Sequence, residues 1–127
     1  RMVSFTGNTG VYLQYAHTRI RSILRKAGDP ETTIDPSIAL HPAERALALE
    51  LDDFGPTLAA VAETLEPHKL CGYLYDLARD FTTFYEACPV LNAEEPVRSN
   101  RLALCRLTAH TLRQGLGLLG ISAPERM

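Results

Sequence analysis

The amino-acid sequence predicts an all-α protein, a helical bundle of four to five helices whose connecting loops are marked by prolines. Three observations support this fold class. Apolar residues recur three and four positions apart in several stretches, as on the buried face of an amphipathic helix. Prolines and glycines separate these stretches, where helices end. A chain of 127 residues, 46% hydrophobic and 22% charged, suits one soluble globular domain covering residues 1–127.

The first helix is expected at residues 8–27. Asn8 or Thr9 can cap its first turn, because a short side-chain oxygen accepts a hydrogen bond from an unpaired backbone N–H. Gly28 can close the helix in the left-handed conformation. One stripe is apolar and is expected to face the core: Leu13, Ala16, Ile20, Ile23, Leu24 and Ala27. A second stripe places phenol rings beside cations, an arrangement that suits single-stranded nucleic acid: Tyr12, Tyr15, Arg19, Ser22 and Lys26.

Four further helices are expected at residues 42–53, 56–65, 67–88 and 99–119. Pro42 stands where the first turn of a helix tolerates proline, and Ser99 can cap the last helix. In that helix Gly115 and Gly117 allow close packing, and Gly120 ends it. The short second helix of this group is expected to bury four apolar side chains: Leu58, Val61, Ala62 and Leu65. The third has a long core-facing stripe: Leu70, Leu74, Leu77, Phe81 and Phe84.

Charge is unevenly distributed along the chain, although the net charge is only −2. Residues 1–28 carry five Lys or Arg and no acid, and residues 98–127 carry five Arg and one Glu. Residues 29–67 carry nine acids and a single Arg. This polarity can present basic first and last helices to a phosphate backbone, or it can reflect ordinary solvated helix faces.

The three cysteines are odd in number and widely spaced, and no Cys-x-x-Cys pair exists. Neither a zinc ribbon nor a redox motif is therefore indicated. Cys71, Cys88 and Cys105 each lie among apolar neighbours, so we expect buried, reduced thiols and a cytoplasmic protein.

Three segments resemble one known family. The first, GNTGVYLQYAHTRIRSI at residues 7–23, looks like the helix that opens the C-terminal, all-helical (DALR-type) anticodon-binding domain of arginyl-tRNA synthetases, the class I arginine–tRNA ligases. Residues 70–91 look like the same family's third major helix and its exit. The final LGLLGISAPERM resembles the family's usual end at a methionine. The resemblance implies a fragment of a longer synthetase, with the catalytic domain outside this sequence.

The resemblance also implies a site for the anticodon loop of tRNA(Arg). A tyrosine at the position of Tyr85 packs against this loop in the family, and the terminal methionine, here Met127, contacts the anticodon. We expect stacking from Tyr12, Tyr15 and Tyr85, and backbone charge from Arg19 and Lys26. Every arginine codon has G in the middle, so a pocket that reads one C could serve all isoacceptors. Some members carry a further aromatic where this chain has Pro89-Val90, which leaves a second stacking platform there open.

No catalytic residue, metal site or cofactor is predicted on this chain. The four histidines lack metal-binding spacing, and His17 is expected to be a satisfied helix histidine rather than a base. Nothing resembles the HIGH or KMSKS signatures, so the resemblance assigns ATP and Mg²⁺ to the missing catalytic domain alone. That catalytic body is the second implied partner. No apolar run approaches the ~20 residues that span a bilayer, and neither membrane nor DNA binding is expected.

A different class of function remains open. The chain could be a free-standing helical module that docks onto a protein partner such as a synthetase body. Salt dependence separates the two, because phosphate contacts weaken steeply with added salt whereas apolar interfaces do not. An enzyme ranks third, because no convergent acid–base constellation is visible. An exposed apolar patch is expected where a catalytic domain would pack.

Overall fold

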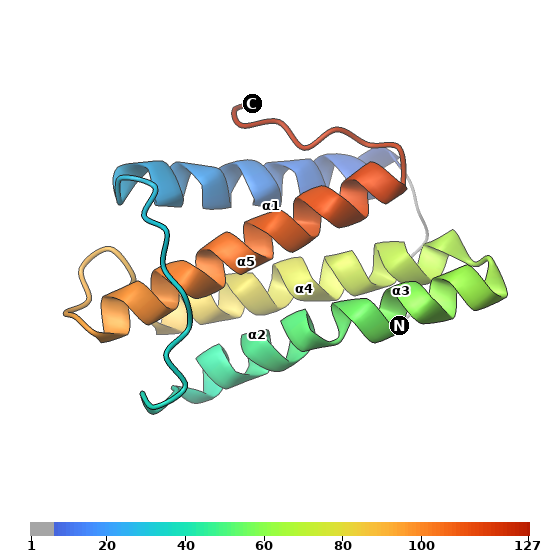
Figure 1. Cartoon of the computed structure of the whole chain (residues 1–127). Coiled ribbons are helices and arrows are strands. Elements are labelled where there is room, and N and C mark those ends of the chain that lie inside the picture. Colours follow the sequence, from blue (N-terminus) through green and yellow to red (C-terminus); the bar gives the residue numbers. More distant parts are fainter. Residues whose placement is uncertain (1–6) are drawn as a thin grey trace.

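The computed structural model describes residues 7–127 and contains five α-helices there (Figure 1). In chain order they are α1 (Gly7–Lys26), α2 (Pro42–Asp52), α3 (Phe54–Thr64), α4 (Pro67–Ala87) and α5 (Val97–Leu118). These described residues contain no β-strand. The all-α bundle predicted from the sequence is therefore confirmed.

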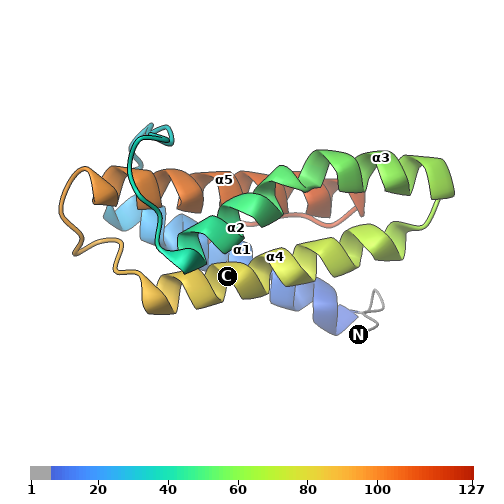
Figure 2. The same ribbon diagram turned by 90° about the horizontal axis from the view of Figure 1, so that it is seen from below.

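Helices α4 and α5 form the centre of the bundle. α4 packs against the other four helices, and α5 packs against α1, α2 and α4. α2 and α3 follow one another along one side of the molecule, and α1 lies on the opposite side (Figure 1). Seen from below, α2 lies across α4 and α5 (Figure 2). After α5 the chain turns back along α1, so its last residues lie beside the first helix (Figure 1).

The core contains the apolar stripes that the sequence predicts on α1 and α4, together with buried residues of α5. The stripe of α4 from Leu70 to Phe84 is fully buried, and each such side chain contributes about 1.5–3 kcal/mol by leaving water. Cys71, Cys88 and Cys105 are buried free thiols, as expected. Burial raises the pKa of Cys105 to about 12, so this thiol stays protonated and unreactive near neutral pH.

The ends of α1 agree with the sequence at one terminus and differ at the other. The helix already includes Gly7, so Asn8 and Thr9 lie in its first turn and do not cap it. At the other end Gly28 has a φ of 84°, the left-handed conformation predicted for it. The backbone N–H of Asp29 then donates to the carbonyl of Leu24 at 2.8 Å, which satisfies one of the last helical acceptors.

The predicted burial of α3 is only partly correct: Leu58 and Val61 are half-buried against the core, whereas Ala62 and Leu65 are exposed. α3 begins at Phe54, two residues earlier than expected, because only Asp53 separates it from α2 and Pro56 fits its first turn. No residue of α3 is fully buried, and Leu65, directly after it, is 82% exposed. The physical reason is its position: α3 packs against α4 and touches α2 only at the junction. Its other sides therefore stay open, and Ala62 is among the exposed residues.

Helix α5 also starts two residues early, at Val97. Ser99 is not its cap, because its backbone N–H donates to Glu95 Oε1 at 2.9 Å and the carboxylate satisfies that first turn instead. A Cβ at Gly115 would come within 2.6 Å of the Leu74 side chain, so the α4–α5 contact needs glycine there. Gly117 faces open space, so the close-packing explanation holds only for Gly115.

The helix ends at Leu118, and Gly120 follows with a φ of 77°, in the role that the sequence predicts for it. Within residues 7–127, no helix combines the length and the apolar character needed to cross a membrane.

Candidate nucleic-acid interface

One side of α1 presents aromatic and cationic side chains to solvent. Tyr12, Tyr15 and Arg19 are three or four residues apart, which places them on one side of the helix. Leu13 and Ile20 point the other way and are fully buried, so packing of the core fixes this orientation. Tyr15 is 61% exposed and Tyr12 is 38% exposed. The stripe predicted from the sequence therefore lies at the surface.

Helix α4 contacts this stripe at two points along α1. The ring of Tyr12 lies 5.4 Å from the ring of Tyr75, measured between centroids. The guanidinium of Arg19 lies 5.3 Å from the centre of the Tyr85 ring, and Tyr85 also stacks on Phe81 at 5.9 Å with an angle of 13° between planes. Cation–π contact and stacking together hold the Arg19 guanidinium in one place.

Tyr15 lies along α1 between these two contacts. Within the described part of the chain, its side chain makes no hydrogen bond and no ring contact, and it is 61% exposed, so the phenol is accessible to a ligand. We refer to Tyr12, Tyr15, Arg19, Tyr75 and Tyr85 as the aromatic face. Sequence reasoning assigned no role to Tyr75, and its ten-residue separation from Tyr85 leaves the two side chains about 80° apart around α4, so helical spacing alone does not group them.

The last seven residues, called the tail below, run along α1 on the flank away from α4. Gln14 Nε2 donates to the carbonyl of Ser122 at 2.9 Å. Thr18 Oγ1 lies 3.1 Å from the carbonyl of Pro124 and 2.9 Å from that of Gln14. These polar contacts order a segment that composition alone suggests would fray. The outer surface of α1 thus has α4 on one flank and the tail on the other.

His17 binds the tail through a hydrogen bond from its buried ring. Its ring is buried and its Nδ1 donates to the carbonyl of Pro124 at 3.1 Å, because a carbonyl oxygen only accepts. Burial lowers the pKa of His17, and the positive charges of Arg21 and Arg113 lower it further, against the opposing effects of Pro124 and Glu125. His17 is therefore the satisfied helix histidine that the sequence analysis expects.

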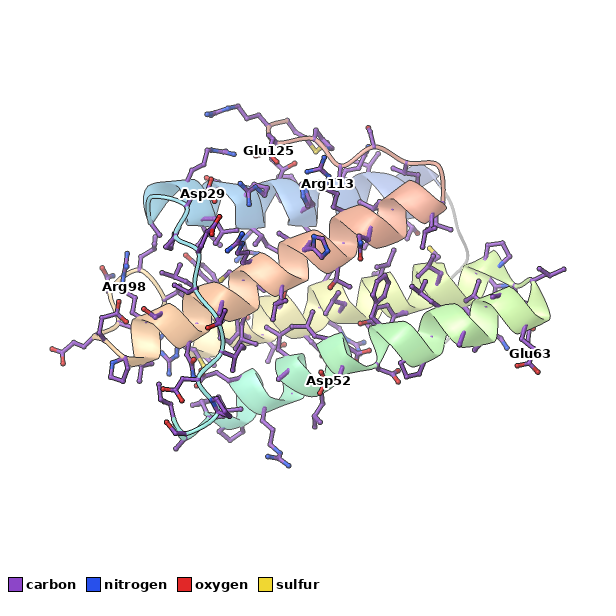
Figure 3. The ribbon with its side chains drawn as sticks, in the orientation of Figure 1. Asp29, Asp52, Glu63, Arg98, Arg113 and Glu125 are labelled. Carbon is purple, nitrogen blue, oxygen red and sulfur yellow. The ribbon has the colours of Figure 1, made fainter. Side chains whose placement is uncertain are left out.

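Glu125 makes the ionic contacts of the tail. Its Oε1 lies 3.1 Å from Arg21 Nε and 3.5 Å from an Arg25 nitrogen, and Arg21 also pairs with Asp29 at 3.1 Å. Slight burial alone would raise the pKa of Glu125, but the hydrogen bond and charge of Arg21, with His17 and Arg25, lower it overall. Figure 3 shows Glu125 and Asp29 on the α1 side of the molecule.

Met127 is 66% exposed at the end of the tail. The C-terminus lies beside the middle of α1 (Figure 1). Of the predicted site residues, the structure brings Arg19 and Tyr85 into direct contact.

The arginines of α5 divide into two groups. Arg98 Nε donates to the carbonyl of Leu91 at 3.3 Å, and Arg101 donates to the carbonyl of Pro89 at 2.7 Å. Both therefore hold the preceding loop in place. Arg106 and Arg113 are exposed on the second half of the helix, as is Lys26 at the end of α1. Only part of the basic charge predicted for the last helix is thus available to a ligand.

An aliphatic groove of about 550 Å³ lies at the end of the bundle formed by α3, the start of α4 and the end of α5. Leu65 and Leu118 are 82% and 64% exposed beside it. Its lining is wholly uncharged: Leu58, Val61, Ala62, Leu65, Pro67, Leu70, Leu118 and Leu119. The exposed apolar patch expected from the sequence is therefore present. Among residues 7–127, no group of three or more His, Cys, Asp and Glu is placed to hold a metal ion.

Comparison with known proteins identifies relatives over the whole chain. The chain is 75% identical over 127 residues to the arginine–tRNA ligase of Frankia casuarinae, and 60% identical to that of Thermobifida fusca. It covers 22% of the length of each of these relatives. The solved structure of Thermus thermophilus arginyl-tRNA synthetase matches 98% of this chain with a TM-score of 0.87 and 49% identity, over 22% of that protein.

A second solved structure, described as a putative arginyl-tRNA synthetase from Campylobacter jejuni, matches 94% of the chain with a TM-score of 0.80 and 28% identity, over 27% of its own length. The DALR anticodon binding domain family matches residues 13–127. That match covers nearly all of the described residues, from the first buried side chain of α1 to the end of the tail. The chain therefore belongs to the DALR anticodon binding domain family.

Proposed function

We propose that this chain recognises the anticodon of tRNA(Arg) as part of an arginine–tRNA ligase, by reading the middle anticodon base. The family and the names of the relatives support this assignment. The observation that carries it is the exposed ring of Tyr15, which lies between the Tyr12–Tyr75 pair and the Arg19–Tyr85 pair. An unstacked loop base needs such a platform with a hydrogen-bond donor beside it.

Tyr15 supplies the stacking surface in this proposal, and Arg19 supplies the donors. A cytosine presents two acceptors, N3 and O2, on its pairing edge, and a guanidinium offers donors in a fixed fork. Tyr85 holds the Arg19 guanidinium in place, so its donors are oriented before the base arrives. Adenine lacks the O2 acceptor and so makes fewer bonds with Arg19. Met127, at the end of the tail, packs against the anticodon loop. Lys26 contacts the phosphate backbone of that loop.

Binding to a hairpin with a seven-base loop tests this proposal. The hairpin carries C or A at the middle anticodon position, and affinity is measured at two salt concentrations. We expect C to be preferred and affinity for both hairpins to fall as salt rises, because phosphate contacts release counterions. Arg19→Gln is expected to reduce the preference for C. Equal affinity for C and A in the unaltered chain would overturn base reading.

The aliphatic groove supports a second part of the proposal: the rest of the arginine–tRNA ligase packs on it. The relatives are more than four times the length of this chain, so a large partner of known identity is available. The groove has no charged lining residue, which favours an apolar protein surface over a nucleic acid. In this proposal the partner, in the cytoplasm, carries the ATP and Mg²⁺ chemistry, and the chain itself holds no catalytic group.

A free-standing docking module uses the same groove without reading RNA. Salt separates the two functions, because apolar docking is insensitive to it and hairpin binding is not. The exposed aromatic face favours RNA reading, since a pure docking module has no need of an open tyrosine beside an oriented guanidinium.

A further inference from the structure

A small basic cavity lies between α1, α5 and the tail, on the far side of the tail from the aromatic face. Its volume is about 180 Å³, roughly six times the ~30 Å³ that one water occupies in the liquid, so a tetrahedral oxyanion fits. Six side chains that can form hydrogen bonds line it: His17, Arg21, Arg106, His110, Arg113 and Glu125.

Helix α5 supplies the open wall of this cavity. Arg106, His110 and Arg113 follow one another at spacings of four and three, so they share one face of the helix. Within the described residues, neither His110 nor Arg113 forms an ion pair or a hydrogen bond, and Arg106 has only a loose pair with Glu31 at 3.8 Å. That pair is weak because Glu31 is 86% exposed.

Helix α1 and the tail supply the opposite wall. Arg21 is held there by Asp29 and by Glu125, so its guanidinium is positioned before any ligand arrives. Glu125 is the only carboxylate among the lining residues, and its charge is already shared by Arg21 and Arg25. Three guanidinium groups and one carboxylate line the cavity; Arg21 and Arg106 also pair with Asp29 and Glu31 outside the lining, and Arg113 does not form an ion pair within the described residues. Figure 3 shows Arg113 on α5 on the same side as Glu125.

The arginines in the two halves of α5 differ in their partners, and this difference supports a binding role for those in the second half. Arg98 and Arg101, in the first half of the helix, are both engaged by loop carbonyls. Arg106 and Arg113, in the second half, have no comparable partner and line a concave space instead. Guanidinium groups converging on a cavity are the usual protein ligand for phosphate, which they bind through short, charge-assisted hydrogen bonds.

We propose that this cavity binds one phosphoryl group, with Arg106 and Arg113 as its main ligands and His110 as an additional donor. The favoured source of this group is a phosphate of the same RNA whose loop lies on the aromatic face. This choice of source rests on the proposed function, whereas the phosphate site itself does not. A phosphate contact positions RNA without reading its sequence. A free oxyanion has the same chemistry, and the experiment separates the two sources.

The first arm of the experiment uses inorganic phosphate and needs no RNA. Amide NMR signals of the chain are followed during a phosphate titration at constant ionic strength. We expect saturable shifts centred on residues 106–113, and their loss in the double variant Arg106→Gln with Arg113→Gln. Arg45→Gln with Arg79→Gln removes the same number of charges at exposed positions on α2 and α4 and serves as the matched control.

The second arm measures hairpin affinity for the same three proteins. If an RNA phosphate fills the cavity, the double variant binds both the C and the A hairpin about tenfold more weakly, as for loss of charge-assisted hydrogen bonds. The slope of log affinity against log salt also falls by about 1, and the preference for C is unchanged.

The outcomes are distinct. Phosphate shifts without a hairpin effect support the cavity and assign it to a free anion. A hairpin effect confined to the double variant supports the RNA source. Absence of both overturns the inference, while a preference for C in that case leaves the proposed function intact. Conversely, phosphate shifts with no preference for C would remove base reading and keep the phosphate site.

Discussion

The aromatic face and the aliphatic groove both expose large apolar side chains, yet their surroundings differ. On the aromatic face, Tyr15 stands beside Arg19, whose guanidinium is held by Tyr85. In the groove, Leu65 and Leu118 are at least as exposed, and every residue that lines the groove is aliphatic. Figure 3 places the acidic residues Asp52 and Glu63 on the α2–α3 side, away from α1.

The difference teaches that exposure alone does not indicate a ligand. Rings with oriented cations can stack on a base and bind its edge or its phosphate. A surface of leucines offers neither, but it gains free energy when another apolar surface removes it from water. The two surfaces therefore suit different partners, RNA for the first and protein for the second. The following predictions separate them.

The largest expected effect is on docking. Replacing Leu65 and Leu118 together by serine removes the two most exposed leucines of the groove. We expect association with a separately produced catalytic part to weaken by roughly 3 kcal/mol, from the apolar burial that is lost. Calorimetry measures this, and hairpin affinity is the second readout and should not change. Leu49→Ser, at an exposed leucine of α2 outside the groove, is the control. Lost hairpin binding in the double variant would contradict the separation of the two surfaces.

Tyr15→Ala should have the next largest effect, now on RNA. Loss of the open stacking ring is expected to weaken binding of the C hairpin by ~1–3 kcal/mol. Fluorescence anisotropy measures it, and docking should be unaffected. Tyr15→Phe keeps the ring and should retain most of the affinity. If alanine and phenylalanine weaken binding equally, stacking is not what Tyr15 contributes.

A change of pH should alter the stability of the bundle through Glu50, which lies outside the aromatic face. Burial, together with the hydrogen bond and negative charge of Asp80, raises the pKa of Glu50 to about 7. Between these two pKa values the folded chain holds a proton that the unfolded chain releases, so the free energy of unfolding should fall as pH rises from about 4.5 to about 7 and should then level off. Urea unfolding at several pH values measures this slope. Glu50→Gln should flatten it; an unchanged slope would assign the pH dependence to another group.

The smallest expected effect concerns the tail. Glu125→Gln removes two half-exposed ion pairs, each worth only about 0.2–1 kcal/mol, so stability should fall by about 1 kcal/mol or less. Because the pKa of Glu125 is lowered, its contribution is present near neutral pH and lost as pH falls through that pKa. Amide exchange of the tail measures the loosening, with exposed Glu86→Gln as control. A tail that exchanges no faster in Glu125→Gln would show that His17 and Thr18 hold it without the ion pairs.

Much of the fold follows from the sequence by itself, because helix formation is local. A period of 3.6 residues placed the buried stripe of α4 correctly, and Gly28 and Gly120 adopt the left-handed conformation that glycine enters without strain. The surface stripe of α1, with Tyr12, Tyr15 and Arg19, follows from the same period. Roles for Tyr85 and Met127 came from the resemblance, and no contact in the structure tests them.

Only the tertiary structure decided which partners these side chains have. Tyr75 meets Tyr12 across 63 positions of sequence, and no local pattern records that α1 packs beside α4. The sequence pattern predicts that Ala62 and Leu65 are buried with Leu58, yet both stay open because α3 packs mainly against α4 and its other sides are uncovered. Likewise Arg101 binds a loop carbonyl while Arg113 lines a cavity, although both read alike as cations off the apolar stripe. Periodicity determines which way a side chain points from its own helix; what it meets there depends on how distant segments pack.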